Sequence, residues 1–258
     1  MFSTYSIDKM GMSVQVILLA IIIAVLLITE PVPQDIRYHN FADTQQLFSI
    51  PNFLNIISNL PLLIAGILGI KSLVNNQITV FFTNKKPYYI FFIAVSLVSV
   101  GSSYYHFYPD NNTLVWDRLP MTIAFMSLFS IVISEQISEK IGARLLIPFI
   151  LLGVLSVIYW IYSEFKGNGD LRLYATVQFI PVLVIPLLLI FFKSKFTMTR
   201  GYWWLIGSYV VSKILEHFDA PIYSLLILIS GHSLKHIMAA IGIYLLLHYY
   251  RKRELKPD

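Results

Sequence analysis

The chain has 258 residues, of which 57% are hydrophobic and 13% charged, and its mean hydropathy is +0.69. An average soluble domain carries about 25% charged residues, so this chain has too few to cover a soluble globule. The net charge of +5 does not indicate a nucleic-acid partner, because the basic residues gather in short runs between apolar segments. The sequence therefore predicts an all-α, polytopic transmembrane helix bundle.

The first apolar segment runs from about Met10 to Thr29, and a membrane span needs roughly 20 such residues. Because it follows Lys9 near the amino terminus, it could also be a signal peptide. No small-residue cleavage site follows it, so we expect an uncleaved membrane helix. A polar loop then extends to about Asn52.

Seven further apolar segments follow this loop. They are Phe53–Leu73, Tyr88–Phe107, Val115–Glu135, Leu145–Tyr162, Leu173–Phe192, Gly201–Glu216 and a last one from about His232 to Tyr250. The short apolar piece Pro221–Gly231 is interpreted as an interfacial or re-entrant turn. The predicted organisation is an N-terminal helix with a polar loop, residues 1–51, and a seven-helix core with a basic tail, residues 52–258.

The lysines and arginines predict the orientation in the membrane. With loops assigned alternately to the two sides, one side collects Lys9, Lys85, Lys86, Lys140, Arg144, Lys193, Lys195, Arg200, Arg251, Lys252, Arg253 and Lys256. The other side has Arg37, Arg118, Lys166 and Arg172. Cytoplasmic loops carry the excess of Lys and Arg, so both termini are predicted to lie in the cytoplasm.

The chain has no cysteine, so a transition metal must be bound by His, Asp or Glu. His106 ends the third predicted helix, and Ser102 lies four residues earlier on the same face. A short turn over residues 109–112 reverses the chain, and Asp117 then opens the next helix. His106 and Asp117 are therefore predicted to lie at the same depth, and ionisable groups in membrane helices are functional candidates.

The last helix begins with a second pair of histidines. His232 and His236 are four residues apart, the spacing at which two helical histidines bind zinc together. The charge pattern places them on the same, non-cytoplasmic side as His106. Three imidazoles and one water form a catalytic zinc set, so we predict a zinc site made by His106, His232 and His236.

Other polar residues allow two interpretations. His39 and His248 are interpreted as interfacial anchors or helix hydrogen-bond partners, and His217 as either interfacial or a support of the zinc ligands. Three further side chains could line the site, although hydrogen bonding between helices is the simpler interpretation. These are Asn55, Ser58 and Asn59.

The pattern Ser102-x-x-x-His106, Asp117 and His232-x-x-x-His236 resembles that of the alkaline ceramidase family. This family is part of a wider group of membrane hydrolases that includes the progestin and adiponectin receptors. The eleven-residue step from His106 to Asp117 also matches the ceramidases.

The resemblance covers roughly Asn52–Tyr250, and the stretch Asn52–Asn59 is similar to the family's first core helix. It implies a zinc-dependent amidase that hydrolyses the N-acyl bond of ceramide or a similar N-acylated lipid. Asp117 would then transfer protons, and Ser102 would hydrogen-bond the oxyanion or the zinc-bound water. The eukaryotic members have an acidic, calcium-binding amino-terminal segment, but here Asn52 stands where a Glu is expected, which argues against a calcium site.

Three alternatives stay open at the level of sequence. The same zinc core could serve a lipid-sensing receptor with little hydrolysis. A metal or proton transporter would need polar residues through the cytoplasmic half of the bundle, where mid-helix positions are mostly Leu, Ile, Val and Phe. Zinc chemistry also does not separate ester from amide hydrolysis. The chain has no Gly-x-Ser-x-Gly motif, which argues against a serine hydrolase.

Overall fold

The computed structural model describes residue 17 and residues 20–81 and 85–257. In this part of the chain the named elements are one 3₁₀ helix and nine α-helices, and none is a strand. In order they are η1 (Ile36–His39), α2 (Phe53–Ile57), α3 (Leu60–Val74), α4 (Lys86–Phe107), α5 (Asn111–Gln136), α6 (Glu139–Phe165), α7 (Arg172–Phe191), α8 (Arg200–His217), α9 (Asp219–Leu226) and α10 (Gly231–Lys252). The predicted all-α class is confirmed.

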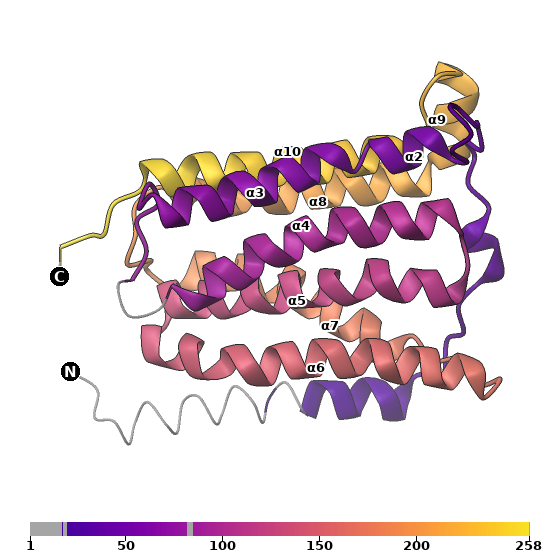
Figure 1. Cartoon of the computed structure of the whole chain (residues 1–258). Coiled ribbons are helices and arrows are strands. Elements are labelled where there is room, and N and C mark those ends of the chain that lie inside the picture. Colours follow the sequence, from indigo (N-terminus) through magenta and orange to yellow (C-terminus); the bar gives the residue numbers. More distant parts are fainter. Residues whose placement is uncertain (1–16, 18–19, 82–84, 258) are drawn as a thin grey trace.

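The long helices α3 to α8 and α10 run side by side as one bundle (Figure 1). The turns α3–α4, α5–α6 and α7–α8 lie at the end that also holds the C-terminus, here called the C-terminal end. The turns α4–α5 and α6–α7, η1 and α9 lie at the opposite end, here called the α9 end. The seven-helix core expected from the apolar segments is therefore present.

Five of the described helical segments are long and apolar enough to cross a membrane. They are Phe53–Val74, Lys86–Phe107, Asn111–Gln136, Glu139–Phe165 and Arg172–Phe191. The pair α9 and α10, bent by 103° at its break, makes a sixth candidate span, which agrees with the predicted turn at Pro221–Gly231. Although α8 crosses the bundle too, it holds three charged residues in 18, so its composition is less apolar than that of its neighbours. The apolar helices indicate an integral membrane protein.

The predicted first span, Met10–Thr29, lies largely outside the described residues. Residues 20–28 are helical, and Figure 1 shows them alongside α6. Ile22 is buried and faces a small gap between α5, α6 and α7, while Arg172 Nη1 donates to the Leu26 carbonyl at 2.9 Å. This helix is thus attached to the outside of the seven-helix core.

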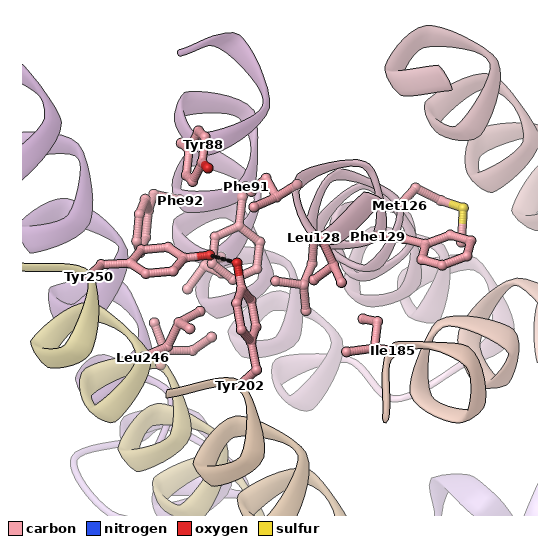
Figure 2. Packing of buried hydrophobic residues seen from close by; sticks show 14 of the residues in the cluster. Tyr88, Phe91, Phe92, Met126, Leu128, Phe129, Ile185, Tyr202, Leu246 and Tyr250 are labelled. Carbon is pink, nitrogen blue, oxygen red and sulfur yellow. Dashed lines mark hydrogen bonds between the residues drawn. The ribbon is translucent and has the colours of Figure 1, made fainter. Parts of the chain in front are cut away.

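A layer of large apolar and aromatic side chains fills the C-terminal half of the bundle (Figure 2). Tyr88 and Phe92 from α4, Tyr202 from α8 and Tyr250 from α10 are almost fully buried there. Since lipid is as apolar as these side chains, close packing and interhelical hydrogen bonds hold membrane helices together. The hydrogen bond of 2.8 Å between the Tyr202 and Tyr250 hydroxyls is one such contact.

The tight α4–α5 turn is fixed by a capping box at the start of α5. Asp110 accepts from the Thr113 backbone N–H at 2.7 Å, and the Asp110 N–H donates to Thr113 Oγ1 at 3.1 Å. The bond from the Thr113 N–H stabilises the ionised carboxyl and holds the pKa of Asp110 below its ordinary value. The turn sets the register between the end of α4 and the start of α5, which carry His106 and Asp117.

Candidate metal centre

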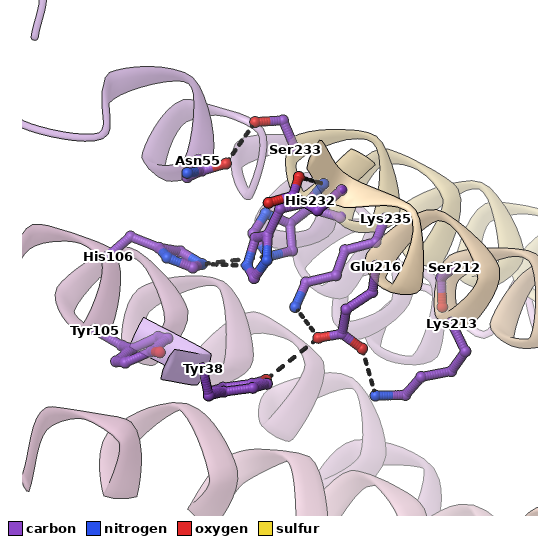
Figure 3. Close-up of polar contacts among 12 residues, drawn as sticks. Tyr38, Asn55, Tyr105, His106, Ser212, Lys213, Glu216, His232, Ser233 and Lys235 are labelled. Carbon is purple, nitrogen blue, oxygen red and sulfur yellow. Dashed lines mark hydrogen bonds and ion pairs between the residues drawn. The ribbon is translucent and has the colours of Figure 1, made fainter. Parts of the chain in front are cut away.

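Three histidine side chains meet at the α9 end of the bundle (Figure 3). His106 comes from the last turn of α4, and His232 and His236 come from the first turns of α10. All three are buried, and one nitrogen from each lies within 4.8 Å of the others. His106 Nε2 is 3.3 Å from His232 Nε2 and 3.4 Å from His236 Nε2. The structure therefore brings together the three residues predicted from the sequence.

These distances fit a zinc ion. Zinc binds imidazole nitrogens at about 2.0–2.1 Å in tetrahedral geometry, which puts two ligand nitrogens about 3.3 Å apart. A neutral imidazole has one N–H, so His106 Nε2 can donate to only one of its two neighbouring nitrogens. A cation between the three nitrogens satisfies all of them at once. The histidine group can hold a metal ion and suits zinc, since imidazole is a favoured zinc ligand.

Two polar contacts orient the histidines of α10. Ser58 Oγ lies 2.9 Å from His236 Nδ1, which leaves Nε2 of that ring to face the metal position. The backbone N–H of His232 donates to Asp219 Oδ1 at 2.7 Å, so the start of α9 fixes the start of α10. A Cβ on Gly231 would lie 2.2 Å from the Leu215 carbonyl oxygen, so only glycine permits this approach to α8.

The loop before α2 covers the histidines. The Phe41 ring packs edge-on against His106 and His232, with centroid distances of 4.7 and 4.8 Å. Ala42 N–H donates to Asp219 Oδ2 at 3.0 Å, and Asn52 Nδ2 donates to the His106 carbonyl at 2.8 Å. The loop thus shields the histidine nitrogens from water, a role that no periodic sequence pattern indicated.

Ser102 and Asp117 face each other across the α4–α5 contact. A Cβ on Gly101 would lie 1.9 Å from the Trp116 carbonyl oxygen, so the glycine allows the two helix backbones to touch at this level. The Ser102 hydroxyl consequently lies close enough to the Asp117 carboxylate to interact with it. Both side chains line the same cavity as His236.

This cavity has a volume of about 310 Å³ and lies between α3, α4, α5, α7, α8 and α10. Its polar end lies at the histidine group, next to Ser102 and Asp117. Its other end is lined by apolar side chains that include Phe91, Leu128 and Ile185. A molecule with a polar group at one end and a hydrocarbon chain at the other matches this division.

The polar end also holds a charged cluster that sequence reasoning missed (Figure 3). Glu216 on α8 forms ion pairs with Lys213 at 2.7 Å and with Lys235 on α10 at 2.5 Å. The Tyr38 hydroxyl donates to the same carboxylate at 3.2 Å. Two signals were present in the sequence: Lys213 and Glu216 are three apart on one helix, and Lys235 lies between the two α10 histidines.

The remaining histidines do not join the metal group. His39 bonds Tyr105 Oη at 2.9 Å and Asn111 Oδ1 at 3.0 Å, which makes it a hydrogen-bond partner of two helices. His217 is exposed beside Phe218, and His248 is exposed beside Tyr249. His217 therefore supports no ligand of the group.

The structure distinguishes the roles of Asn55, Ser58 and Asn59. Ser58 touches His236, as described above, and Asn59 lines the cavity. Asn55 accepts from the Ser233 hydroxyl at 2.7 Å and so joins α2 to α10. The Asn55 side chain is thus a hydrogen-bonding link between helices, and it does not line the cavity.

An apolar helix bundle with a buried three-histidine group defines an integral membrane protein with a candidate metal centre. The family model described as Ceramidase matches residues 39–255, which is most of the chain. The chain therefore belongs to the ceramidase family. A comparison with curated proteins found no match. Membership suggests a hydrolase that acts on amide bonds and a lipid substrate with an N-acyl chain.

Proposed function

We propose that this protein is a zinc-dependent membrane amidase that hydrolyses the N-acyl bond of ceramide or a similar N-acylated lipid. The observation that carries the proposal is the convergence of three histidine nitrogens with Ser102 and Asp117 at the polar end of one cavity. His106, His232 and His236 would hold the metal. Zinc in such a site lowers the pKa of water to about 7 and polarises a carbonyl oxygen.

Two side chains of the chain itself would carry the proton transfers and the charge stabilisation. Asp117 lines the cavity next to His236 and is placed to accept the proton of the attacking water and later deliver it to the leaving amine. Ser102 is placed to donate a hydrogen bond to the oxyanion of the tetrahedral intermediate. The products would be a fatty acid and an amino lipid.

The apolar end of the cavity would hold the acyl chain. Among the described residues, α7 and α8 both line the cavity without packing extensively on each other. A hydrogen bond of 3.1 Å from Gln178 to Tyr209 bridges them. We therefore infer that a lipid enters sideways from the bilayer between these two helices.

The basic residues support an orientation. The loops at the C-terminal end carry the larger set of lysines and arginines, so that end is proposed to face the cytoplasm with both chain termini. The histidine group then lies toward the non-cytoplasmic face. The division into an N-terminal part, residues 1–51, and a core, residues 52–258, stays a prediction, although loop residues such as Phe41 pack on the core.

The test is hydrolysis by the purified protein. With acyl-labelled ceramide and zinc, we expect fatty-acid release that a chelator stops and zinc restores. The His232→Ala variant should lose both bound zinc and activity, whereas the exposed-histidine control His248→Ala should keep both. Activity retained by His232→Ala would rule out the proposed centre.

The substrate itself can be identified in cells. Lipids from cells that express the wild-type protein are compared with lipids from cells that express His232→Ala. An N-acylated lipid that accumulates only with the variant is the substrate. If a lipid binds tightly but no amide or ester is cleaved, the protein is a receptor of the related class instead.

A further inference from the structure

The lysines at the polar end of the cavity are not needed for the proposed hydrolysis. Lys213 and Lys235 share one carboxylate, Glu216, which accepts from each ammonium with a different oxygen (Figure 3). Each ammonium has three N–H donors, and its contact with Glu216 uses one of them. Both lysines line the cavity, so their other donors are available to a bound molecule.

Arg118 on α5 adds a third cation to the lining of the cavity. Its side chain is 6% exposed, and its guanidinium lies over the rings of Trp160 at 4.1 Å and Tyr174 at 4.6 Å. Nη2 donates to Gln34, but Nη1 has no hydrogen-bond partner among the described residues. Aromatic faces hold the guanidinium plane in place, and a buried unsatisfied donor costs free energy that an acceptor on a ligand removes.

The polar end of the cavity therefore has an excess of positive charge before any metal is added. Its ionisable lysines, arginine and carboxylates are Arg118, Lys213, Lys235, Asp117 and Glu216, which leaves one cation without a matching carboxylate. A buried charge is costly unless it is paired. The hydroxyl groups of a neutral headgroup such as that of ceramide would not neutralise it.

We propose that the substrate is an N-acyl lipid whose amine half carries an anionic oxygen group, a carboxylate or a phosphate, bound by Arg118, Lys213 and Lys235. This inference rests on the proposed function, because it assumes that the cleaved amide lies at the histidine group. In an N-acyl amino acid the carboxylate is two bonds from the amide nitrogen, so it would lie beside the metal position. There it would meet the lysines, which occupy the same end of the cavity as Asp117 and His236.

The experiment compares three lipids with the same acyl chain. N-palmitoylethanolamine is neutral, N-palmitoylglycine carries a carboxylate, and N-palmitoyl-phosphoethanolamine carries a phosphate. We expect kcat/KM for at least one anionic lipid to exceed that for the neutral lipid roughly ten- to hundredfold, the usual effect of a hydrogen bond to a charged group. The anionic lipid that is preferred identifies the headgroup.

Variants separate recognition from structural support. Lys213→Met keeps the length of the side chain and removes its charge, and Lys166→Met at an exposed position of the same end is the matched control. We expect Lys213→Met to lower kcat/KM for the anionic lipid about tenfold more than for the neutral lipid. If the lysines only joined α8 to α10, both lipids would lose equally or neither would lose.

A binding measurement keeps this inference separate from the proposed function. The Asp117→Asn protein is titrated with N-palmitoylglycine and N-palmitoylethanolamine in detergent at low and high salt. Tighter, salt-sensitive binding of the anionic lipid that Lys213→Met weakens supports the inference, even if no lipid is hydrolysed. Equal binding of both lipids, or a preference for the neutral lipid in either experiment, overturns it and leaves hydrolysis of a neutral lipid intact.

Discussion

Both ends of the helix bundle bury charged side chains, and they differ in how those side chains are paired. Among the described residues the Glu135 carboxylate at the C-terminal end is fully paired, whereas the Arg118 guanidinium at the α9 end is not. At the C-terminal end, Glu135 is fully buried and Arg253 is 3% exposed. Glu135 Oε1 accepts from Tyr88 and from Arg253 Nη1, each at 2.6 Å, and Oε2 accepts from Tyr202 at 2.8 Å. Both carboxylate oxygens are thus satisfied within the protein.

At the α9 end the polar atoms remain available. His106 Nδ1 and Arg118 Nη1 have no hydrogen-bond partner among the described residues, and three histidine nitrogens face one another. The cavity also reaches the histidine group, whereas Glu135 is not among the residues that line it. A saturated buried ion pair is expected to hold helices together, whereas unpaired donors beside a cavity indicate a site for a ligand.

This contrast also bears on the transporter alternative. The Glu135 cluster is a set of polar residues at the C-terminal end, where the sequence offered few at mid-helix positions. It is not part of the cavity, because Glu135 and its partners Tyr88, Tyr202 and Arg253 are absent from the cavity lining. The Glu135 cluster is therefore separate from the cavity, which favours the hydrolase over a transporter.

Among the substitutions that test this contrast between the two ends, Asp117→Asn is expected to have the largest effect on activity. The Asp117→Asn variant removes the proposed proton acceptor, and general acid–base groups contribute roughly 10²- to 10⁴-fold in rate. We expect kcat to fall by that factor, with zinc content and thermal stability close to wild type. A normal kcat in the purified variant would remove Asp117 from the mechanism.

At the opposite end, Glu135→Gln should affect stability rather than chemistry. It leaves the Arg253 guanidinium buried without a counter-charge, and breaking such a pair costs about 3–5 kcal/mol. Thermal unfolding in detergent should occur at a lower temperature, while the protein that remains folded keeps its zinc and its kcat. Loss of zinc from folded Glu135→Gln protein would break the distinction between the two ends.

A smaller effect is expected at Ser58, which touches a predicted ligand without touching the metal position. Ser58→Ala removes the contact to His236 Nδ1, and loss of such an orienting partner lowers metal affinity about 10- to 100-fold. Competition with a zinc chelator of known affinity measures this change. The cavity-lining variant Ser212→Ala is the control, since the Ser212 hydroxyl donates to the Tyr209 carbonyl of its own helix and has no contact with a histidine among the described residues.

The smallest effect concerns the capped turn between α4 and α5. Asp110→Ala should cost about 1 kcal/mol of stability, the usual value of an N-cap. Because the pKa of Asp110 is lowered in the folded state, its contribution is present above the ordinary carboxyl pKa and is lost as pH falls through the folded value. The difference in melting temperature between wild type and variant should therefore shrink in acid.

The sequence was sufficient to predict the parts of the site that are set by residue spacing along the helices. The spacing of His232 and His236, the step from His106 to Asp117 and the depth set by the basic loops are all short-range patterns. The structure brings the three histidines together, as the four-residue spacing of metal-binding histidines on a helix predicts. The apolar segments also located the helices of the core, although α6 begins at Glu139 and not near Leu145, and the segment from Phe53 is divided into α2 and α3.

The parts of the site that depend on contacts between distant segments of the chain could not be predicted. Phe41 and Tyr38 come from an irregular loop whose path is set by tertiary contacts. The pairing of Glu216 with Lys235 needs the register between α8 and α10, which no local pattern gives. The near-perpendicular bend at α9 could be placed only approximately, because a short apolar piece has the same composition as part of a span.

The most direct test of the account is the metal content of the purified protein. Elemental analysis of wild-type protein, prepared without chelator, should find about one zinc ion per chain. X-ray absorption should show nitrogen neighbours at about 2.0–2.1 Å, and His236→Ala should retain little or no zinc. Wild-type protein that binds no zinc even when the ion is supplied, and whose thermal unfolding zinc does not change, would contradict the central claim.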